Sequence, residues 1–325
     1  MKKLIFFSLL IVGIYIGARF HLAWTRPNSD RNTRVQLTIP SGASLSTIAD
    51  MLEDKNLISD SFAFQIYSRY KKLGTRYQAG EYIIPSNLTF EEIATDYLLN
   101  GKSNEIKVTI PEGSTIKQID EILVKKGLIT PGDFEECANF CDLGFRIDSF
   151  EGYLFPSTYY ESTSAFTSKK FIQRLYNTFN QQIRPFRDDI ADSGRTLNEI
   201  VIVASMIERE AFRDSPDEKA LISDVIWKRL DERIHLGIDA TTRYELNAWK
   251  RPLYTADFEA RTPYNTRRVL GLPPTAISNP GLASLRAAIY PTPNKYYYYL
   301  HAPNGQIHFG VTLEDHNRNK RTHLW

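Results

Sequence analysis

The pattern of apolar and polar positions repeats itself in the first half of the chain. Residues 36–59 (QLTIPSGASLSTIADMLEDKNLIS) align without a gap with residues 107–130 (KVTIPEGSTIKQIDEILVKKGLIT). The same offset of 71 positions carries Tyr82-Ile-Ile-Pro-Ser86 onto Tyr153-Leu-Phe-Pro-Ser157. Because two separate segments keep one register, the pattern indicates an internal duplication.

Each copy of the duplicated segment predicts the same series of elements. Alternating apolar residues predict a first strand over 35–39 and over 106–110. A Pro-x-Gly turn follows, and then a helix that begins at Ser44 or Thr115.

After a second helix (62–71; 133–139), a last strand is expected over 80–84 and over 152–155. This order, strand-helix-helix-strand, resembles in topology that of the small glycan-binding LysM module. We therefore expect LysM-like repeats at residues 34–104 and 105–160.

The chain begins with a charged segment followed by a long apolar run. Lys2 and Lys3 precede the uncharged residues 4–18, a pattern that fits a signal peptide as well as a short membrane helix. No small-x-small pair closes the run, and with the residues up to Trp24 it reaches about 20 residues, enough to span a membrane. We favour a signal anchor over residues 1–25, which makes this a single-pass protein of the cell membrane with its large domain exported.

A helix with an unusual end follows in the second half of the chain. The stretch ASMIEREA closes an apolar run that Thr196 and Glu199 can start as a capping box. At about 100° per residue, Glu210 lies within the apolar stripe, Glu208 lies at its edge and Arg209 faces water.

A carboxyl group on an apolar surface has a raised pKa, because burial disfavours its charged form. Glu210 could therefore carry a proton near neutral pH and act as a general acid on a glycosidic oxygen. The alternative is a buried glutamate that pairs with an arginine from elsewhere. Glu208 is interpreted as a residue on the flank of the helix or a partner to a neighbouring strand, and it is kept as a candidate for the site.

Composition excludes several other classes of function. The chain has 325 residues, 42% of them hydrophobic, and a net charge of +2, so no basic bias indicates nucleic acid. The six histidines include no close ligand pair, and neither a nucleophile elbow nor a phosphate loop occurs. We expect no metal and no cofactor. Cys137 and Cys141 have a helical spacing that is awkward for a disulfide, and we expect free thiols.

Several polar turns could bind a sugar that carries N-acetyl groups. They lie around Asp239, around Tyr264 and around Asn279, and their amides, hydroxyls and aromatic faces suit such a ligand, although each is also typical of an ordinary turn. Residues 296–300, in contrast, indicate a buried strand with tyrosines in the core. The candidate substrate-binding residues are Glu151, Glu208, Asp239, Thr241, Tyr264, Asn265, Thr266 and Asn279.

Taken in order, these segments resemble the endolytic murein transglycosylases, a membrane-anchored family that cuts peptidoglycan strands internally. The matching pieces are the N-terminal apolar run, Glu151–Pro156 (EGYLFP), Ala204–Glu210 (ASMIERE), Asp239 with Thr241, Tyr264–Thr266 (YNT), Gly271–Pro274 (GLPP), Asn279–Gly281 (NPG) and Thr312 with Glu314–Asn317 (EDHN). The chain departs from the family pattern at Ser157, Gly237 and Ala240, where Asp, a polar residue and Pro are usual.

The resemblance implies an α+β protein whose mixed α/β catalytic domain spans residues 161–325. It implies a lyase in which Glu210 cleaves the bond between N-acetylmuramic acid and N-acetylglucosamine and leaves a 1,6-anhydro end. The partners it implies are peptidoglycan strands and cell-wall synthases. A membrane-anchored glycan-binding scaffold without activity and a water-using muramidase are the alternatives.

Overall fold

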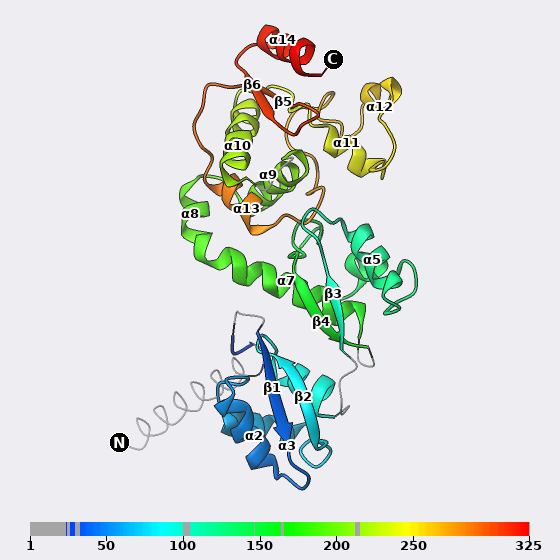
Figure 1. Cartoon of the computed structure of the whole chain (residues 1–325), viewed down its shortest axis with the longest axis vertical. Coiled ribbons are helices and arrows are strands. Elements are labelled where there is room, and N and C mark those ends of the chain that lie inside the picture. The colour runs from blue at the N-terminus through cyan, green and yellow to red at the C-terminus, as the bar shows by residue number, and fades with distance from the viewer. Residues whose placement is uncertain are drawn as a thin grey trace, which may run out of the picture. The chain divides into compact units, whose positions relative to one another are not determined.

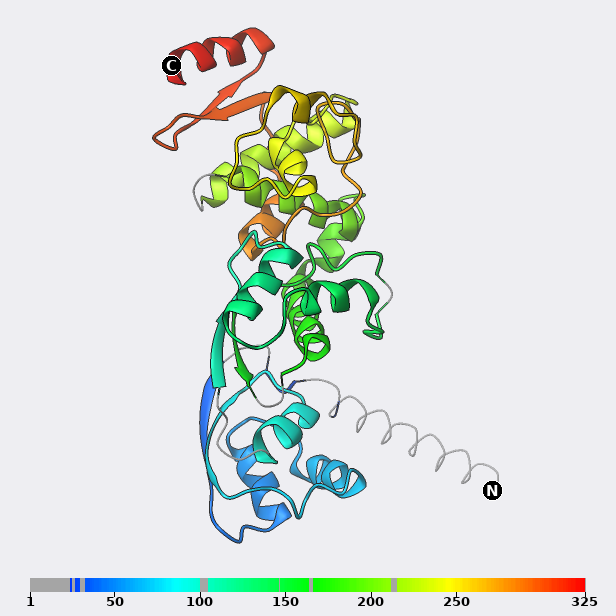
Figure 2. The same cartoon turned by 90° about the vertical axis from the view of Figure 1, so that its right-hand side faces the viewer.

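The computed structural model describes residues 24, 27–29, 33–99, 105–145, 147–163, 166–211 and 215–324. The chain divides into two compact units (Figures 1 and 2). The first holds the described residues up to 107 together with those of 160–166, and the second holds those of 108–159 and 167–325. Each unit combines helices with short strands, in agreement with the expected mixture of α and β structure.

The first unit contains the first copy of the duplicated segment. Strand β1 (Arg34–Ile39) pairs antiparallel with β2 (Gly80–Pro85). Between them lie α2 (Leu45–Asp54) and α3 (Ser61–Tyr70), and a short helix α4 (Phe90–Glu92) with a π-helical turn η1 (Ile93–Leu98) follows. The Ser44 side chain caps α2 by accepting the N–H of Thr47, as expected. The apolar faces of these elements form a core of their own.

The second copy follows the same order. Its elements are β3 (Glu105–Thr109), α5 (Ile116–Lys125), α6 (Asp133–Phe140) and β4 (Thr158–Ser162), and β3 is paired with β4. Thr115 caps α5, as expected. The likeness to LysM modules and the domain boundaries drawn from the sequence stay predictions.

The position predicted for the last strand of this copy is wrong. The strand begins at Thr158 instead of Gly152. The N–H groups of Gly152 and Leu154 donate to the side-chain oxygen of Asn279, at 3.0 and 2.8 Å, and are therefore not available to a neighbouring strand. A residue more than 120 positions away thus changes the structure of this segment.

The expectation of free thiols is also wrong. Cys137 and Cys141 form a disulfide with their Cα atoms 4.7 Å apart. Helix α6 ends at Phe140, and Cys141 is extended (φ −69°, ψ 139°). Because Cys141 has left the helix, the spacing that is awkward within a helix no longer applies to this pair.

Helix α9 (Leu197–Glu210) contributes most of its length to the core of the second unit. Thr196 and Glu199 form the expected capping box at its start. All residues from Ile200 to Ile207 are buried, and α9 packs against α10 (Pro216–Asp231) and α13 (Leu282–Ile289), as Figure 1 shows. The other helices are α7 (Ser168–Ile183), η2 (Arg184–Phe186), α8 (Arg187–Asp192), α11 (Asp239–Glu245) and α12 (Thr255–Glu259).

The chain ends in a hairpin and a helix. Strands β5 (Tyr298–His301) and β6 (Ile307–Gly310) are antiparallel, and α14 (Leu313–His323) packs on both. The strand predicted over 296–300 is present with a small shift. Its tyrosines are only partly buried, whereas Leu300 is buried, because a two-stranded sheet with one helix on it covers few side chains.

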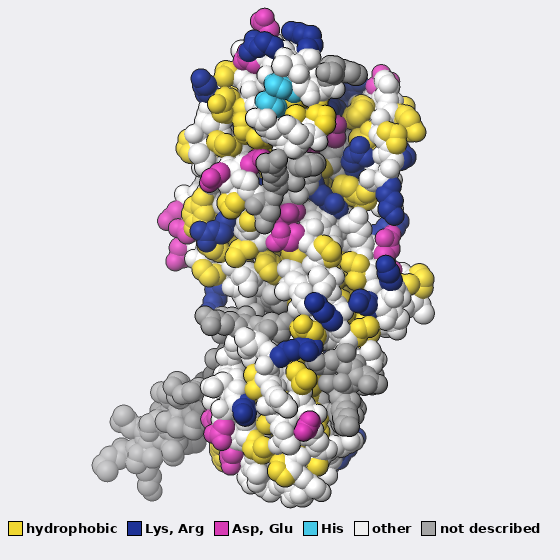
Figure 3. Space-filling model, viewed as in Figure 1, with side chains coloured by type: hydrophobic (Ala, Val, Ile, Leu, Met, Phe, Trp, Pro, Cys, Tyr) yellow, Lys and Arg dark blue, Asp and Glu magenta, His cyan; other side chains and the backbone are white. Residues whose placement is uncertain are grey.

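Nothing in the described residues tests the predicted anchor. Among them, no helix combines the length and the apolar character needed to cross a membrane. The predicted anchor, residues 1–25, lies outside the described residues except for Trp24. On the face seen in Figure 3, acidic and basic side chains both occur, and neither covers the surface.

We predict that Gly152→Ala destabilises the second unit. Gly152 has φ +92°, and a Cβ atom there would lie 2.5 Å from the Cβ of Ala276 and 2.6 Å from Val201 Cγ1. Left-handed backbone and overpacking together should lower the free energy of unfolding by about 2–4 kcal/mol in urea. The matched control is Gly144→Ala, because Gly144 has φ +74° and open space around it. Equal losses in the two variants would contradict the role of close packing at Gly152.

Candidate active site

Glu210 is the last residue of α9, and its side chain reaches the C-terminal hairpin. The helix ends there because Ala211 is extended. The hydroxyl of Tyr299, on β5, donates a hydrogen bond of 3.0 Å to Oε2 of Glu210. Although Glu210 as a residue keeps some contact with solvent, its carboxyl group is enclosed by protein atoms.

This enclosure controls the charge of the carboxyl group. Burial raises the pKa of Glu210 to about 7, and the negative charge of Asp239 acts in the same direction. The hydrogen bond from Tyr299, the positive charge of Arg267 and the backbone N–H of Ala240 act against this rise. Glu210 is therefore able to hold a proton and to release it near neutral pH, as expected from its apolar neighbours in the sequence.

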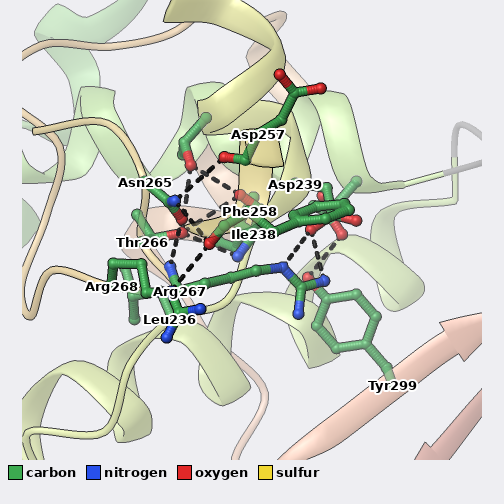
Figure 4. A network of polar contacts seen from close by, with 12 residues as sticks. Leu236, Ile238, Asp239, Asp257, Phe258, Asn265, Thr266, Arg267, Arg268 and Tyr299 are labelled. Atoms are coloured by element: carbon green, nitrogen blue, oxygen red, sulfur yellow. Dashed lines mark hydrogen bonds and ion pairs between the residues drawn. The ribbon is translucent and has the colours of Figure 1, made fainter. Parts of the chain in front are cut away.

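An ion pair lies beside Glu210. Asp239 begins α11, and its Oδ1 accepts from Nε of Arg267 at 2.7 Å and lies 2.6 Å from Nη2. Figure 4 shows Arg267 reaching Asp239, with the ring of Tyr299 pointing toward the same group of atoms. Both members of the pair are about half exposed, and the Arg267 guanidinium also lies over the ring of Phe258. The pair places one negative and one positive charge next to the carboxyl group of Glu210.

The expectation that Arg209 faces water is wrong. Its guanidinium lies 3.8 Å from the ring centroid of Trp249, and Nη2 donates to Gln118 at 3.1 Å. The helical wheel assumes one buried stripe, but α9 is buried on all sides over most of its length. The position of Glu210 in the last turn, where the helix meets the hairpin, therefore decides its surroundings more than the stripe does.

Glu208 makes structural contacts. Its Oε2 accepts from the backbone N–H of Gly281 at 3.0 Å and from the hydroxyl of Ser284 at 2.7 Å, both at the start of α13. Its Oε1 lies 3.6 Å from Nζ of the buried Lys219, on α10. Glu208 thus links α9 with α10 and α13, and both of its carboxylate oxygens contact protein groups.

Asn279 is fully buried and makes hydrogen bonds to two other segments. Its side-chain oxygen accepts from Gly152 and Leu154, and its side-chain nitrogen donates to Ser114 O at 2.9 Å and to Glu151 Oε1 at 3.0 Å. Its backbone N–H donates to Ser114 O, and its backbone oxygen accepts from Gly113 N–H, both at 2.8 Å. Asn279 thereby connects the loop before α13 to the turn between β3 and α5.

Glu151 belongs to the same buried network. It is 3% exposed, and its carboxyl group accepts from Ile116 N–H at 3.2 Å and from the hydroxyl of Tyr244 at 3.2 Å, besides Asn279. Burial raises the pKa of Glu151 to about 8, with the hydrogen bonds from Ile116 and Tyr244 acting in the opposite direction. Glu151 is therefore a buried carboxyl group that protein groups hold in place and whose charged form is disfavoured.

Three further candidates hold the loops on either side of Asp239, as Figure 4 shows for Asn265 and Thr266. The Asn265 amide donates to the carbonyl oxygens of Asp257, Phe258 and Ala260, at 3.3, 3.1 and 2.6 Å, and so ends α12. Thr266 Oγ1 accepts from Ile238 N–H at 2.9 Å.

Thr241 Oγ1 donates to Ile238 O at 2.7 Å and lies 3.2 Å from Thr266 Oγ1. Thr241, Asn265 and Thr266 are at most 2% exposed. Together they fix the positions of Asp239 and Arg267, whose side chains reach solvent.

Tyr264 is partly buried, and its hydroxyl lies 2.8 Å from Thr275 Oγ1. Its ring packs at 5.3 Å against that of Tyr244, which contacts Glu151. Of the predicted substrate residues, the structure thus groups Asp239 with Glu210, and Tyr264, Glu151 and Asn279 with one another.

The structure gives a backbone reason for two of the departures from the family pattern, Gly237 and Ala240. Gly237 has φ +67°, which favours glycine, and its N–H donates to Thr266 O at 3.1 Å. Ala240 has a backbone N–H that acts on Glu210, and a proline at this position would lack it. Ser157 lies just before β4, and its carbonyl oxygen accepts from Ile110 N–H at 2.8 Å.

Sequence reasoning missed Tyr299, Arg267 and Lys219. The sequence pattern places Tyr299 in a tyrosine-rich core strand, and its contact with Glu210 depends on the fold. Arg267 directly follows the motif Tyr264-Asn-Thr266, so its place in the sequence was the available signal. Among the described residues, no cluster of His, Cys, Asp and Glu is arranged to hold a metal ion.

Comparison with known proteins gives consistent matches over most of the chain. A model of the YceG-like family matches residues 37–322. The chain is 29% identical to an endolytic murein transglycosylase of Bacillus subtilis, over 91% of this chain and 86% of that protein. It is 26% identical to one of Streptococcus pneumoniae, over 99% of this chain and 64% of that protein. A crystal structure of a YceG-like protein from Listeria monocytogenes superposes with a TM-score of 0.61 at 28% identity, over 89% of this chain and 99% of that one.

We predict opposite outcomes for two substitutions of Glu151. Glu151→Ala leaves the buried donors of Asn279 and Ile116 without acceptors, which should lower the free energy of unfolding by about 2–5 kcal/mol. Glu151→Gln keeps an acceptor and should stay within about 1 kcal/mol of the wild type at low pH.

The pH dependence of stability separates these variants further. A carboxyl group whose folded pKa is raised to about 8 contributes stability that is present below its ordinary pKa of 4.5 and is lost as the pH rises to about 8. Urea unfolding should therefore show wild-type stability falling over this range relative to Glu151→Gln. A constant difference between the two proteins from pH 5 to 8 would contradict the buried, uncharged state of Glu151.

Proposed function

Because the chain belongs to the YceG-like family, we propose that it is a lytic transglycosylase that cuts peptidoglycan glycan strands internally, the activity for which its relatives are named. The proposed products are shorter strands that end in 1,6-anhydro-N-acetylmuramic acid. Such cutting would end or trim the growth of new glycan strands.

The observation that carries this proposal is the state of Glu210. It lies at the end of a buried helix, and its pKa is raised to about 7 by enclosure in protein. A group that must first give a proton and then take one works best when its pKa is near the working pH. Glu151 also has a raised pKa, but it is buried and both of its oxygens accept from protein groups, whereas Glu210 keeps contact with solvent and so with a substrate.

The chemistry needs only one such carboxyl group. Protonated Glu210 gives its proton to the oxygen that links N-acetylmuramic acid to N-acetylglucosamine, and the bond from C1 to that oxygen breaks. The 6-hydroxyl of the same muramyl residue then closes onto C1, and the Glu210 carboxylate takes its proton. Glu210 ends in its starting state and no water is consumed.

A water-using muramidase differs in what it requires. Enzymes that hydrolyse glycosides use two carboxyl groups, one of which activates water or attacks the sugar. The second carboxylate near Glu210 is that of Asp239, and it forms an ion pair with Arg267. A hydroxyl tethered within the substrate has a large advantage over water in effective concentration. Ring closure is therefore the favoured outcome in this site.

The predicted substrate residues divide by exposure. We propose direct contacts with the glycan for Asp239 and Tyr264, because both are partly exposed. Asp239 lies near Glu210, and Tyr264 lies near the buried network of Glu151 and Asn279. Glu151, Glu208, Thr241, Asn265, Thr266 and Asn279 have protein partners, and we propose that they position the loops that hold the sugar.

We also propose where the protein acts. The apolar run in residues 1–25 would serve as an uncleaved anchor in the cell membrane, with the second unit exported to the side where peptidoglycan is made. Cell-wall synthases are the partners that this location and the family resemblance favour.

The first test is the pair Glu210→Gln and Glu208→Gln. Purified Glu210→Gln should fold normally and cut isolated glycan strands about 10²- to 10⁴-fold more slowly, because it can neither give nor take the proton. Glu208→Gln keeps an acceptor for Gly281 and Ser284 and should retain most of the rate per folded molecule. The measurement is the mass and amount of anhydro-ended products with time. A dead Glu208→Gln beside a fully active Glu210→Gln would move the assignment to Glu208, and full activity of both would remove the chemistry from α9.

The anchor is tested by fractionation of cells. We predict that the protein stays in the membrane fraction after washing with high salt, with its N-terminal residues intact by mass spectrometry. Protein that begins after Ala18 in the soluble exported fraction would instead establish a cleaved signal peptide.

A further inference from the structure

We propose that Tyr299 is a positioning residue for the proposed reaction, which fixes the rotamer of Glu210 and keeps the transferable proton off Oε2. This inference rests on the proposed function and adds a role that β5 performs in it. The contact that carries it is the hydrogen bond of 3.0 Å from the Tyr299 hydroxyl to Oε2 of Glu210.

The first step of the argument is that Tyr299 is itself held in place. It lies on β5, and Leu300 beside it is buried. Its ring packs at 6.4 Å against Phe309 on β6 and at 6.4 Å against His301. The strand pairing Tyr299↔Phe309 fixes the backbone on which the ring stands. A hydroxyl on such a support restricts the last side-chain torsion of a glutamate that stands at a helix end.

The second step concerns the direction of the hydrogen bond. A phenol donates to a carboxylate as long as it keeps its own proton. Burial and the neighbouring charge of Glu210 raise the pKa of Tyr299 well above its ordinary value of 10, so its hydroxyl stays protonated throughout the working range. An oxygen that already accepts a hydrogen bond is a poorer place for a proton. The hydrogen bond from Tyr299 therefore disfavours the proton on Oε2 of Glu210.

The third step is that the same contact serves both halves of the reaction. After Glu210 has given up its proton, the carboxylate is stabilised by a donor that is already in position and needs no rearrangement. The other groups that face this pair are Asp239 from α11, Arg267 from the following loop, Arg229 from α10 and the Ala240 N–H. His301, which packs on Tyr299, is paired with Glu218 at 2.9 Å. Two of these groups hydrogen-bond Glu210, the backbone N–H of Ala240 and the hydroxyl of Tyr299, and only the second can be removed by a side-chain substitution.

The test compares Tyr299→Phe with wild type across pH, using isolated glycan strands as substrate. Phe keeps the ring and its packing and removes only the hydroxyl. We expect kcat at the optimum to fall about ten- to hundredfold with little change in KM, because the interaction is made to the reacting carboxyl group and not to the sugar.

The pH profile gives a readout that a merely structural residue would not move. Wild-type activity should fall with rising pH through a pKa of about 7, because Glu210 must start protonated. The hydrogen bond from Tyr299 lowers that pKa, so its removal should shift the alkaline limb upward by about one unit. The variant is thus expected to be slower at the optimum and yet to keep more of its own maximum at pH 8.

Tyr298→Phe is the matched control. Tyr298 is the adjacent residue of the same strand, where successive side chains point to opposite faces, and its ring stacks on His316 and lies 4.8 Å from Arg229. The substitution keeps the ring and both contacts. The Tyr298→Phe variant should have the kcat of the wild type and the same pH profile of activity. If Tyr299→Phe retains the wild-type kcat and the wild-type alkaline limb, or if Tyr298→Phe reproduces the shift, the proposal is wrong.

A direct titration separates this inference from the proposed function. Infrared spectra of the full chain with isotope-labelled glutamate, with Glu210→Gln to assign the band, report protonation of Glu210 without any substrate. We expect its midpoint to rise by about one pH unit in Tyr299→Phe. A shifted midpoint in a protein that cuts no strands would overturn the proposed function and keep the contact between Tyr299 and Glu210. An unshifted midpoint in an active protein would overturn the role of Tyr299 alone.

Discussion

The arrangement of the second unit depends on the burial of one amide, the side chain of Asn279. A buried polar group needs its hydrogen bonds, since each unsatisfied donor or acceptor costs about 1–3 kcal/mol. Asn279 meets this requirement by bonding to two chain segments at once. One is the turn at Ser114, and the other supplies the carboxyl group of Glu151 and the backbone N–H groups of Gly152 and Leu154. These contacts can form together only when the second repeat, the segment before β4 and the loop before α13 lie in one arrangement. The amide therefore specifies that arrangement.

The placement of Glu210 follows from this frame. The loop that carries Asn279 also contacts α9, because the Ile277 N–H donates to Ser205 Oγ at 3.0 Å and the Gly281 N–H donates to Glu208. Ser205 and Glu208, two of the polar residues in the second half of α9, thus bind the loop before α13. With the helix end fixed, Glu210 meets Tyr299 and lies beside the ion pair of Asp239 and Arg267. The same burial that stabilises the helix raises the pKa of the carboxyl group at its end.

The parts of this picture that the sequence could predict are the local ones. The caps at Ser44, Thr115 and Thr196 were found because a cap needs only residues within one turn. The raised pKa of Glu210 could be predicted because its apolar neighbours along the helix are close in sequence, and its catalytic role stays a prediction. The prediction of a strand at Gly152 was wrong because the N–H groups of this segment donate to the distant Asn279. The prediction of free thiols was wrong because α6 ends one residue before Cys141. Tyr299 could not be found, since nothing near it in the sequence shows that it meets a residue on α9.

The central claim is that one carboxyl group closes the muramyl ring without water, and digestion of purified glycan strands in water enriched in heavy oxygen tests it most directly. The account predicts new ends, formed inside long strands, that are lighter by one water than reducing ends and carry no label. Label at the new ends would contradict it and identify a water-using muramidase. The absence of new ends with active, folded protein would contradict it as well and favour a glycan-binding scaffold.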